Sequence, residues 1–188
     1  QNINWLVAGQ PDEERRRLNV LKSFYVKYER KLPALIADFC QYYDPLPMHE
    51  VVFYYDATAL GSNYAVNDQD FCWVITHELQ LHGWRVRPVY IGTPMKHIEK
   101  YQLINRGFDG KARLMPFFNE PNNPDLLISV QTAGVYNGKK DKRREKLAET
   151  DEDRLESRTD GSDAFDTLYI GCERFPQQPV QLVVTGGG

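Results

Sequence analysis

Apolar residues recur at helical spacing over the first quarter of the chain. After the acidic residues 12–14, positions 18, 21, 24, 25 and 28 are apolar or aromatic, as on one face of a helix. Pro33 interrupts this pattern, and apolar positions continue from residue 35 to residue 43. The spacing predicts two helices, so residues 1–48 are expected to form a helical extension or linker that packs on the following domain.

The strongest strand signal lies at residues 51–55, where five consecutive residues are apolar or aromatic. Such a run is typical of a central strand that is covered on both faces. Asp56 follows directly, and residues 57–61 are mostly small. A carboxylate at the end of a buried strand is costly to bury unless it is paired or binds a metal. Asp56 is therefore the first candidate functional residue.

Residues 71–91 fit two interpretations. The segments 71–79 and 84–91 are rich in β-forming residues and flank His82-Gly83, which favours a β-hairpin. A helix over residues 70–82 also matches the apolar positions. The hairpin is the preferred interpretation, and the helix remains the alternative.

Helices and strands alternate over the rest of the chain, which predicts an α/β fold built on a mixed sheet. We expect this sheet domain to span residues 49–175, and residues 176–188, rich in Pro, Gln and Gly, to form a mobile tail. The expected elements are a helix over 94–105, a strand over 112–118, a helix from Pro124, a charge-dense segment over 139–156 and a last helix from about Ser162.

Composition narrows the class of protein. The length of 188 residues favours one domain, and 11 Tyr, 9 Phe and 3 Trp argue against disorder. A net charge of −3 excludes a uniformly basic surface but allows a local basic groove. Three distant cysteines without a CxxC motif argue against a disulfide framework or a zinc knuckle, and no apolar run is long enough to span a membrane. Because the sequence starts at Gln1, it is expected to be a piece of a longer protein.

Three acidic residues occur at expected element ends. Asp56 and Glu120 each follow a strand, and Asp163 opens the last helix. Carboxylates at neighbouring strand ends are able to share Mg²⁺ or Mn²⁺, because these hard cations prefer oxygen ligands. The alternative for each residue is a turn or helix-capping role, which is common for acids at such positions.

The sequence around these acids resembles a known family. The motifs are Tyr-Asp-Ala-Thr-Ala-Leu-Gly at 55–61, Pro-Phe-Phe-Asn-Glu-Pro-Asn at 116–122 and Gly-Ser-Asp-Ala-Phe-Asp-Thr-Leu at 161–168. Their order is similar to that in the C-terminal nuclease domain of phage DNA-packaging terminase large subunits. The similarity covers about residues 50–172. Ser162 departs from the family pattern, in which an acid is usual at this position.

The resemblance implies a ribonuclease H-like fold and a metal-dependent endonuclease. By this analogy Asp56, Glu120 and Asp163 are the catalytic metal ligands for two Mg²⁺ or Mn²⁺ ions, and Asp166 is an additional acid of the metal site. The implied substrate is double-stranded DNA, cleaved by two-metal hydrolysis in the host cytoplasm. The packaging ATPase is expected outside this sequence, which has no GxxxxGK[ST] motif. The portal and the small terminase subunit are possible further partners.

A basic cluster lies between the second and third acids. Lys139, Lys140, Lys142 and Arg143 are candidates to bind DNA phosphates, with Lys140 and Lys142 preferred. The alternative is a solvated helix face, in which these residues pair with the acids that follow them.

Two other functions remain open from the sequence. One is a different ribonuclease H-like nuclease, of the junction-resolvase or integrase type. The other is a non-catalytic docking module of a packaging motor, in which the acids are structural and the N-terminal segment binds another component.

Overall fold

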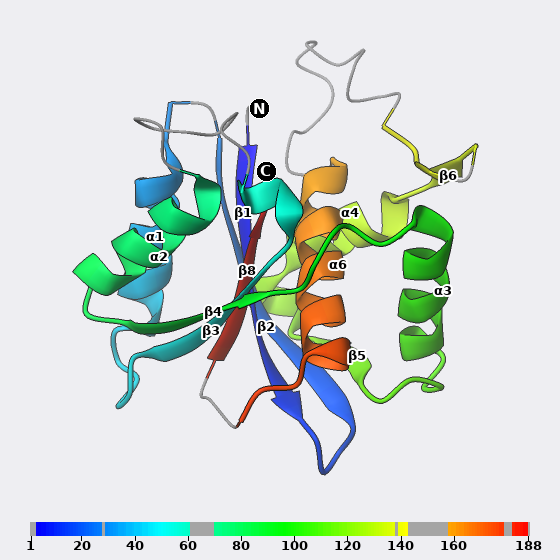
Figure 1. Cartoon of the computed structure of the whole chain (residues 1–188), viewed down its shortest axis with the longest axis horizontal. Coiled ribbons are helices and arrows are strands. Elements are labelled where there is room, and N and C mark those ends of the chain that lie inside the picture. Colours follow the sequence, from blue (N-terminus) through cyan, green and yellow to red (C-terminus); the bar gives the residue numbers. More distant parts are fainter. Residues whose placement is uncertain are drawn as a thin grey trace.

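The computed structural model describes residues 3–27, 29–60, 70–137, 139–142, 158–178 and 182–187. They form a mixed six-stranded sheet with helices on both faces (Figure 1). The strand order is β4-β3-β8-β1-β2-β5, and β1 is antiparallel to both of its neighbours whereas the other pairs are parallel. The expected α/β class with a mixed central sheet is confirmed.

The N-terminal segment is a β-hairpin, so the helix expected before Pro33 is wrong. β1 (Ile3–Asp12) and β2 (Arg17–Lys27) pair antiparallel, and β1 lies between β8 and β2 inside the sheet. Only the second expected helix forms, as α1 (Leu32–Tyr43) with a proline in its first turn. The expected helical extension over residues 1–48 therefore contributes two strands to the central sheet.

A β-bulge explains why this hairpin has a helix-like pattern. The register between β1 and β2 shifts by one residue, which leaves Leu21 as an extra residue in β2. Beyond a bulge, residues of the same parity face the opposite side of the sheet, so the two-residue period is broken. Accordingly, Leu18 and Val20 pack in the core under α6, whereas Phe24 and Val26 pack in the core under α1.

The region after Asp56 contains the helix that was the alternative interpretation. β3 (Glu50–Tyr55) forms as expected and leads into the short turn η1 (Ala57–Leu60). The expected hairpin is wrong, because α2 (Phe71–Leu81) connects to β4 (Arg85–Tyr90), which is parallel to β3. Parallel neighbours need such a crossover. Asp70 caps α2 by accepting a hydrogen bond of 2.7 Å from the backbone nitrogen of Trp73.

The C-terminal segment is also part of the sheet. β8 (Leu182–Gly187) lies between β3 and β1, and Leu182, Val183 and Val184 are buried. The expected mobile tail is therefore wrong for residues 182–187. The short apolar run of β8 forms a strand because its backbone pairs with β1 on one side and with β3 on the other. The Pro- and Gly-rich composition around this run does not indicate a strand.

The remaining helices follow the expected order, but the two short strands at residues 135–136 and 139–140 were not expected. The last helix starts three residues earlier than expected and is the longest in the described part of the chain. The elements are α3 (His97–Phe108), β5 (Met115–Phe118), η3 (Glu120–Asn122), α4 (Pro124–Thr132), the strands β6 (Val135–Tyr136) and β7 (Lys139–Lys140), and α6 (Thr159–Arg174).

The helices form two layers on the sheet. α1 and α2 cover one face, at the left in Figure 1, and α6 with α4 and α3 lies on the other. On the α6 side Gly171 lies against the ring of Tyr54, where a larger residue would overlap the ring. None of the described helices combines the length and the apolar character needed to cross a lipid bilayer.

Candidate functional site

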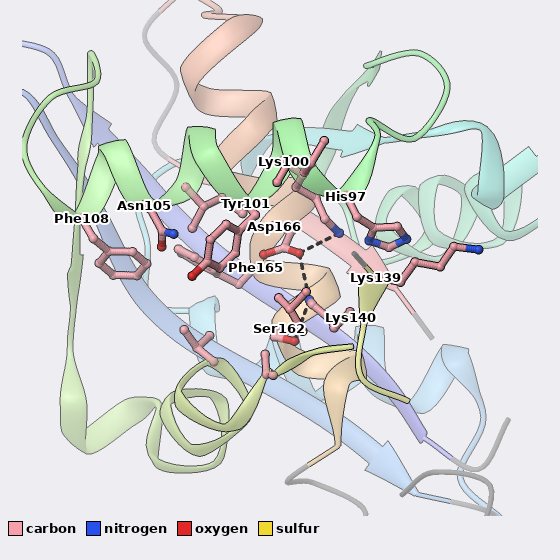
Figure 2. Close-up of a pocket in the computed structure, with 16 residues that line it drawn as sticks. His97, Lys100, Tyr101, Asn105, Phe108, Lys139, Lys140, Ser162, Phe165 and Asp166 are labelled. Carbon is pink, nitrogen blue, oxygen red and sulfur yellow. Dashed lines mark hydrogen bonds and ion pairs between the residues drawn. The ribbon is translucent and has the colours of Figure 1, made fainter. Parts of the chain in front are cut away.

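The first two turns of α6 bring three oxygen atoms to one ammonium group. Nζ of Lys140, from β7, lies 2.8 Å from Ser162 Oγ and 2.9 Å from Asp166 Oδ2 (Figure 2). The same nitrogen lies 2.8 Å from Asp163 Oδ1. Asp166 lies about one turn after both Ser162 and Asp163, so each of these two side chains is its neighbour on the helix surface. The helix thus gathers two carboxylates and a hydroxyl at one point.

Two more lysines complete what we call the lysine–aspartate cluster. Lys100 of α3 lies 2.8 Å from Asp166 Oδ2 and 3.6 Å from Asp163 Oδ1. Lys142 lies 2.9 Å from Asp163 Oδ2. The side chains of Lys140 and Asp166 are only 10% and 9% exposed, so each depends on its charged partners for stability. The cluster of Lys100, Lys140, Lys142, Asp163 and Asp166 holds one more positive than negative charge.

The lysines change the protonation equilibria of the cluster. Burial raises the pKa of Asp163, but the charges and hydrogen bonds of Lys140 and Lys142 outweigh it and lower the pKa to about 2. Burial lowers the pKa of Lys100, but the charges and hydrogen bonds of Asp166 and Asp163 raise it by a larger amount, so the net shift is upward. Burial and the charge of Lys100 lower the pKa of His97. Asp163 and Lys100 are therefore charged at neutral pH.

Asp56 directly follows β3, at the end of the sheet where α6 begins. The backbone nitrogen of Ile91 donates a hydrogen bond to the carbonyl of Tyr55, and that of Ala57 donates to the carbonyl of Gly92. The residues before and after Asp56 are therefore held next to the end of β4. Its carboxylate accepts hydrogen bonds from the backbone nitrogen and the hydroxyl of Thr58, so it caps η1. This is the turn role that the sequence left open.

The first turn of α6 is located at this same end of the sheet. Gly161 lies against Trp5, which is paired with Gly187 at the end of β8, and β8 runs parallel to β3. In Figure 1 the turn after β3 and the start of α6 lie at the same end of the molecule. Asp56 and Asp163 are thus brought to one end of the sheet.

Glu120 lies apart from both. It begins η3 after β5, and β8, β1 and β2 separate β5 from β3. Four strand spacings correspond to about 19 Å across the sheet. The glutamate is exposed, and Asn122 in the same turn donates to the Tyr42 hydroxyl of α1, on the opposite face from α6. The structure does not bring Glu120 to the lysine–aspartate cluster.

The basic segment is a β-hairpin where it is described, and not a helix face. Lys139 and Lys140 form β7, which pairs with β6. Lys140 and Lys142 point to the aspartates of α6, whereas Lys139 is exposed. Arg143 lies outside the described residues. In the described residues Lys140 and Lys142 pair with Asp163 and Asp166 of α6. The following acids, which were expected as partners of these lysines, lie outside the described residues.

A pocket of about 280 Å³ adjoins the cluster (Figure 2). It lies between α3, α4, α6 and the β6–β7 hairpin. Aromatic residues line one part of it, and the ammonium groups of the cluster lie at the other. The labelled lining residues are His97, Lys100, Tyr101, Asn105, Phe108, Lys139, Lys140, Ser162, Phe165 and Asp166.

Sequence analysis missed the contribution of α3 to this site. Lys100 was not singled out, and neither were the aromatic residues Tyr101 and Phe108. The sequence did contain an indication of this surface, because α3 has apolar residues on more than one face. Ile98, Tyr101 and Phe108 are exposed, while Leu103 and Ile104 pack on the core. A helix with apolar residues beyond its buried face indicates a binding surface.

The oxygen atoms around Lys140 Nζ fit a hard divalent cation by chemical type, since Mg²⁺ and Mn²⁺ prefer carboxylate and hydroxyl oxygens. In the part of the chain that the structure describes, no three His, Cys, Asp or Glu side chains are grouped to hold a metal. The ammonium of Lys140 takes the place of a cation between Asp163 and Asp166. A metal at this point therefore requires Lys140 to move away.

Comparison with known proteins adds no identification. No protein-family model matches the sequence, and no similar curated protein or solved structure was found.

Proposed function

We propose that this chain is a metal-dependent endonuclease domain with a ribonuclease H-like fold. The observation that carries the proposal is the convergence of Ser162 Oγ, Asp163 Oδ1 and Asp166 Oδ2 within 2.9 Å of one cationic nitrogen. Asp56 lies at the same end of the sheet. Carboxylates that hold one or two divalent metal ions are a common construction of sites that hydrolyse phosphodiesters.

The sheet is compatible with this assignment. Strands β2, β1, β8, β3 and β4 follow one another across it, and β1 is antiparallel to strands that otherwise run in one direction. A mixed sheet of this kind with helices on both faces supports a ribonuclease H-like arrangement. The motifs at residues 55–61 and 161–168 support the narrower proposal of a packaging terminase nuclease.

Asp163 and Asp166 would hold the metal, with Asp56 as the ligand delivered by β3. When bound, Mg²⁺ or Mn²⁺ would supply activation of water and stabilisation of the leaving oxygen. Glu120 is left out of this set because it follows β5, which lies about 19 Å across the sheet from β3, the strand that delivers Asp56.

Lys140 and Lys142 have a second role in the proposal. An ammonium group that leaves a carboxylate for an incoming metal needs another anionic partner, and a DNA phosphate is one. Lys140 is on β7 and Lys142 follows two residues later, and both side chains contact Asp163 of α6. Exchange of these lysines between carboxylate and phosphate couples metal binding to DNA binding.

The proposed substrate is double-stranded DNA, read through its backbone and with little sequence preference. The packaging ATPase, the portal and the small terminase subunit are proposed partners by analogy with the terminase family.

The test is cleavage of plasmid DNA in Mn²⁺. We expect Asp163→Asn and Asp56→Asn each to reduce the cleavage rate at least 100-fold, because each removes a carboxylate of the proposed metal site. The matched control is Asp38→Asn on α1, which loses only an exposed ion pair with Arg30. Full activity of Asp163→Asn, or equal losses in all three variants, would overturn the proposal.

The positive charge of the cluster favours a second candidate, a non-catalytic module that binds DNA. Three ammonium groups outnumber two carboxylates, so the cluster attracts phosphate without a metal. Calorimetry with Mn²⁺ separates the two functions. Binding that Asp163→Asn abolishes supports the nuclease, and DNA binding without any Mn²⁺ binding supports the module.

A further inference from the structure

We propose that the pocket between α3 and α6 binds a single nucleotide, with the base against Phe108 and Phe165 and the phosphate near Lys139 and Lys140. This goes beyond the nuclease proposal and does not depend on it, because neither a metal nor cleavage is required for binding. The free mononucleotide and an unpaired nucleotide at a DNA strand end share this chemistry.

The aromatic part of the pocket suits a base. The ring centroids of Phe108 and Phe165 are 6.1 Å apart, and Phe118 packs behind both at 6.3 and 5.1 Å. Phe165 is buried, which fixes it as part of the wall, whereas Phe108 is 42% exposed and presents free ring surface. Bases of every type stack on aromatic side chains because each base has a flat π-face.

Polar groups on α3 are placed to contact the edge of the base. Tyr101 and Asn105 both line the pocket, and their spacing of four residues puts them on one side of the helix. Neither side chain forms a hydrogen bond with any residue that the structure describes. The carboxamide of Asn105 has both donors and an acceptor, which matches the mixed edge of a nucleobase.

The charge distribution suits a phosphate at the other part. Lys100, Lys139 and Lys140 line it, and among the lining residues that the structure describes Asp166 is the one carboxylate. Lys100 and Lys140 share that carboxylate, while Lys139 is exposed at the rim. The pocket therefore has an apolar aromatic part and a cationic part, as a base joined to a phosphate requires.

The volume limits what enters. About 280 Å³ lies at the lower limit of ligand pockets, so one nucleotide fits but not a base pair. A base in duplex DNA is stacked and paired, and must be unpaired before an enzyme pocket accepts it. The pocket therefore selects free nucleotides or single-stranded ends over intact duplex.

The test measures binding in EDTA, where metal-dependent cleavage cannot occur. The probes are dTMP, thymidine, inorganic phosphate, a five-residue oligo-dT and a blunt 20-base-pair duplex. We expect saturable binding of dTMP or of oligo-dT, with thymidine and inorganic phosphate each at least tenfold weaker. Tight binding of dTMP assigns the site to free nucleotides, and binding of oligo-dT alone assigns it to a strand end. Phosphate that competes as well as dTMP, or no saturation by either nucleotide probe, would overturn the proposal.

Matched variants locate the binding. Phe108→Ala and Tyr101→Ala each remove exposed aromatic surface, and we expect affinity to fall roughly 5- to 100-fold for Phe108→Ala, as loss of one base stack predicts. Trp73→Ala is the control, an aromatic residue of similar exposure on α2. Equal losses for Phe108→Ala and Trp73→Ala would contradict the assignment. Asp56→Asn, which removes a proposed metal ligand outside the pocket lining and without a contact to its lysines, is expected to keep nucleotide binding, so failure of cleavage and failure of this proposal are distinguishable.

Discussion

Two helices of equal length, α1 and α3, are attached to the sheet in different ways. Each has 12 residues, but α1 buries six of them, whereas α3 buries only Gly107. α1 inserts Leu35, Ile36 and Phe39 into the core at 0% exposure. α3 is joined through partly buried Leu103 and Ile104 and through the ion pair of Lys100 with Asp166.

The comparison distinguishes α1, which mainly stabilises the fold, from α3, which supplies side chains to the proposed ligand pocket. A helix whose side chains fill a core is constrained at every buried position, because interiors are close-packed. A helix held by one charged residue and a few partial contacts leaves its other side chains available for a ligand. In this molecule the aromatic and polar groups of the proposed nucleotide pocket come largely from the loosely held helix.

The largest expected effect on stability is in α1. Phe39→Ala should lower the free energy of unfolding by about 3–5 kcal/mol, because it removes a fully buried ring and leaves a cavity. Urea denaturation followed by circular dichroism measures it. Phe108→Ala in α3 is the matched variant and should cost less than about 1 kcal/mol, since that ring is 42% exposed. Equal costs would remove the distinction between the two helices.

An intermediate effect is expected at the one tightly packed point of α3. A methyl group at Gly107 would overlap the Tyr169 ring and hydroxyl, which donates to the carbonyl of Leu114 at 2.9 Å. Overpacking costs about 1–3 kcal/mol, and the better helix propensity of alanine offsets up to about 1 kcal/mol. Gly107→Ala should therefore lower the free energy of unfolding by about 1–2 kcal/mol in the same assay.

Gly134→Ala is the control for this variant. A methyl group there meets no atom closer than 3.9 Å, so a change below about 0.5 kcal/mol is expected. An unchanged or more stable Gly107→Ala variant would show that α3 is free to move away from Tyr169.

A further expected effect is the pH dependence contributed by Asp163. Its pKa is lowered from 3.8 to about 2 in the folded protein, by Lys140 and Lys142 acting against burial. The folded state thus binds the proton less readily than the unfolded state. The stabilisation is fully present above about pH 4 and is lost as the pH falls towards 2.

Urea denaturation between pH 2 and pH 6 tests this sign. The difference in unfolding free energy between the wild type and Asp163→Asn should shrink as the pH is lowered through this range. A difference that stays constant would mean that the lysines do not hold this carboxylate ionised.

Much of the fold could be predicted from local patterns. The run at 51–55 predicted β3 because five buried positions in succession suit a central strand. Pro124 and the spacing of Phe165 and Leu168 predicted α4 and α6. The hairpin β1–β2 was missed because the bulge at Leu21 breaks the two-residue period, and β8 was missed because its partners are nearly the whole chain away in sequence.

The candidate site was predictable only in part. Asp163 and Asp166 were singled out from one motif, since residues on one helix turn share a side whatever the tertiary structure. Whether Glu120 joins them depends on strand order, and no local pattern indicates that β5 pairs with β2 at the outer edge. Lys100 was missed because its partner Asp166 lies 66 residues later in the chain.

The sequence by itself determined the class of fold and placed two aspartates on the first turns of a helix, because periodicity and helix geometry act over a few residues. Only the tertiary structure decided which groups meet those aspartates. It put three lysines from α3 and the β7 segment around them, left Glu120 at the far side of the sheet, and opened a pocket beside α3. These outcomes follow from long-range strand pairing and charge pairing, which sum over the whole chain and leave no local pattern in it.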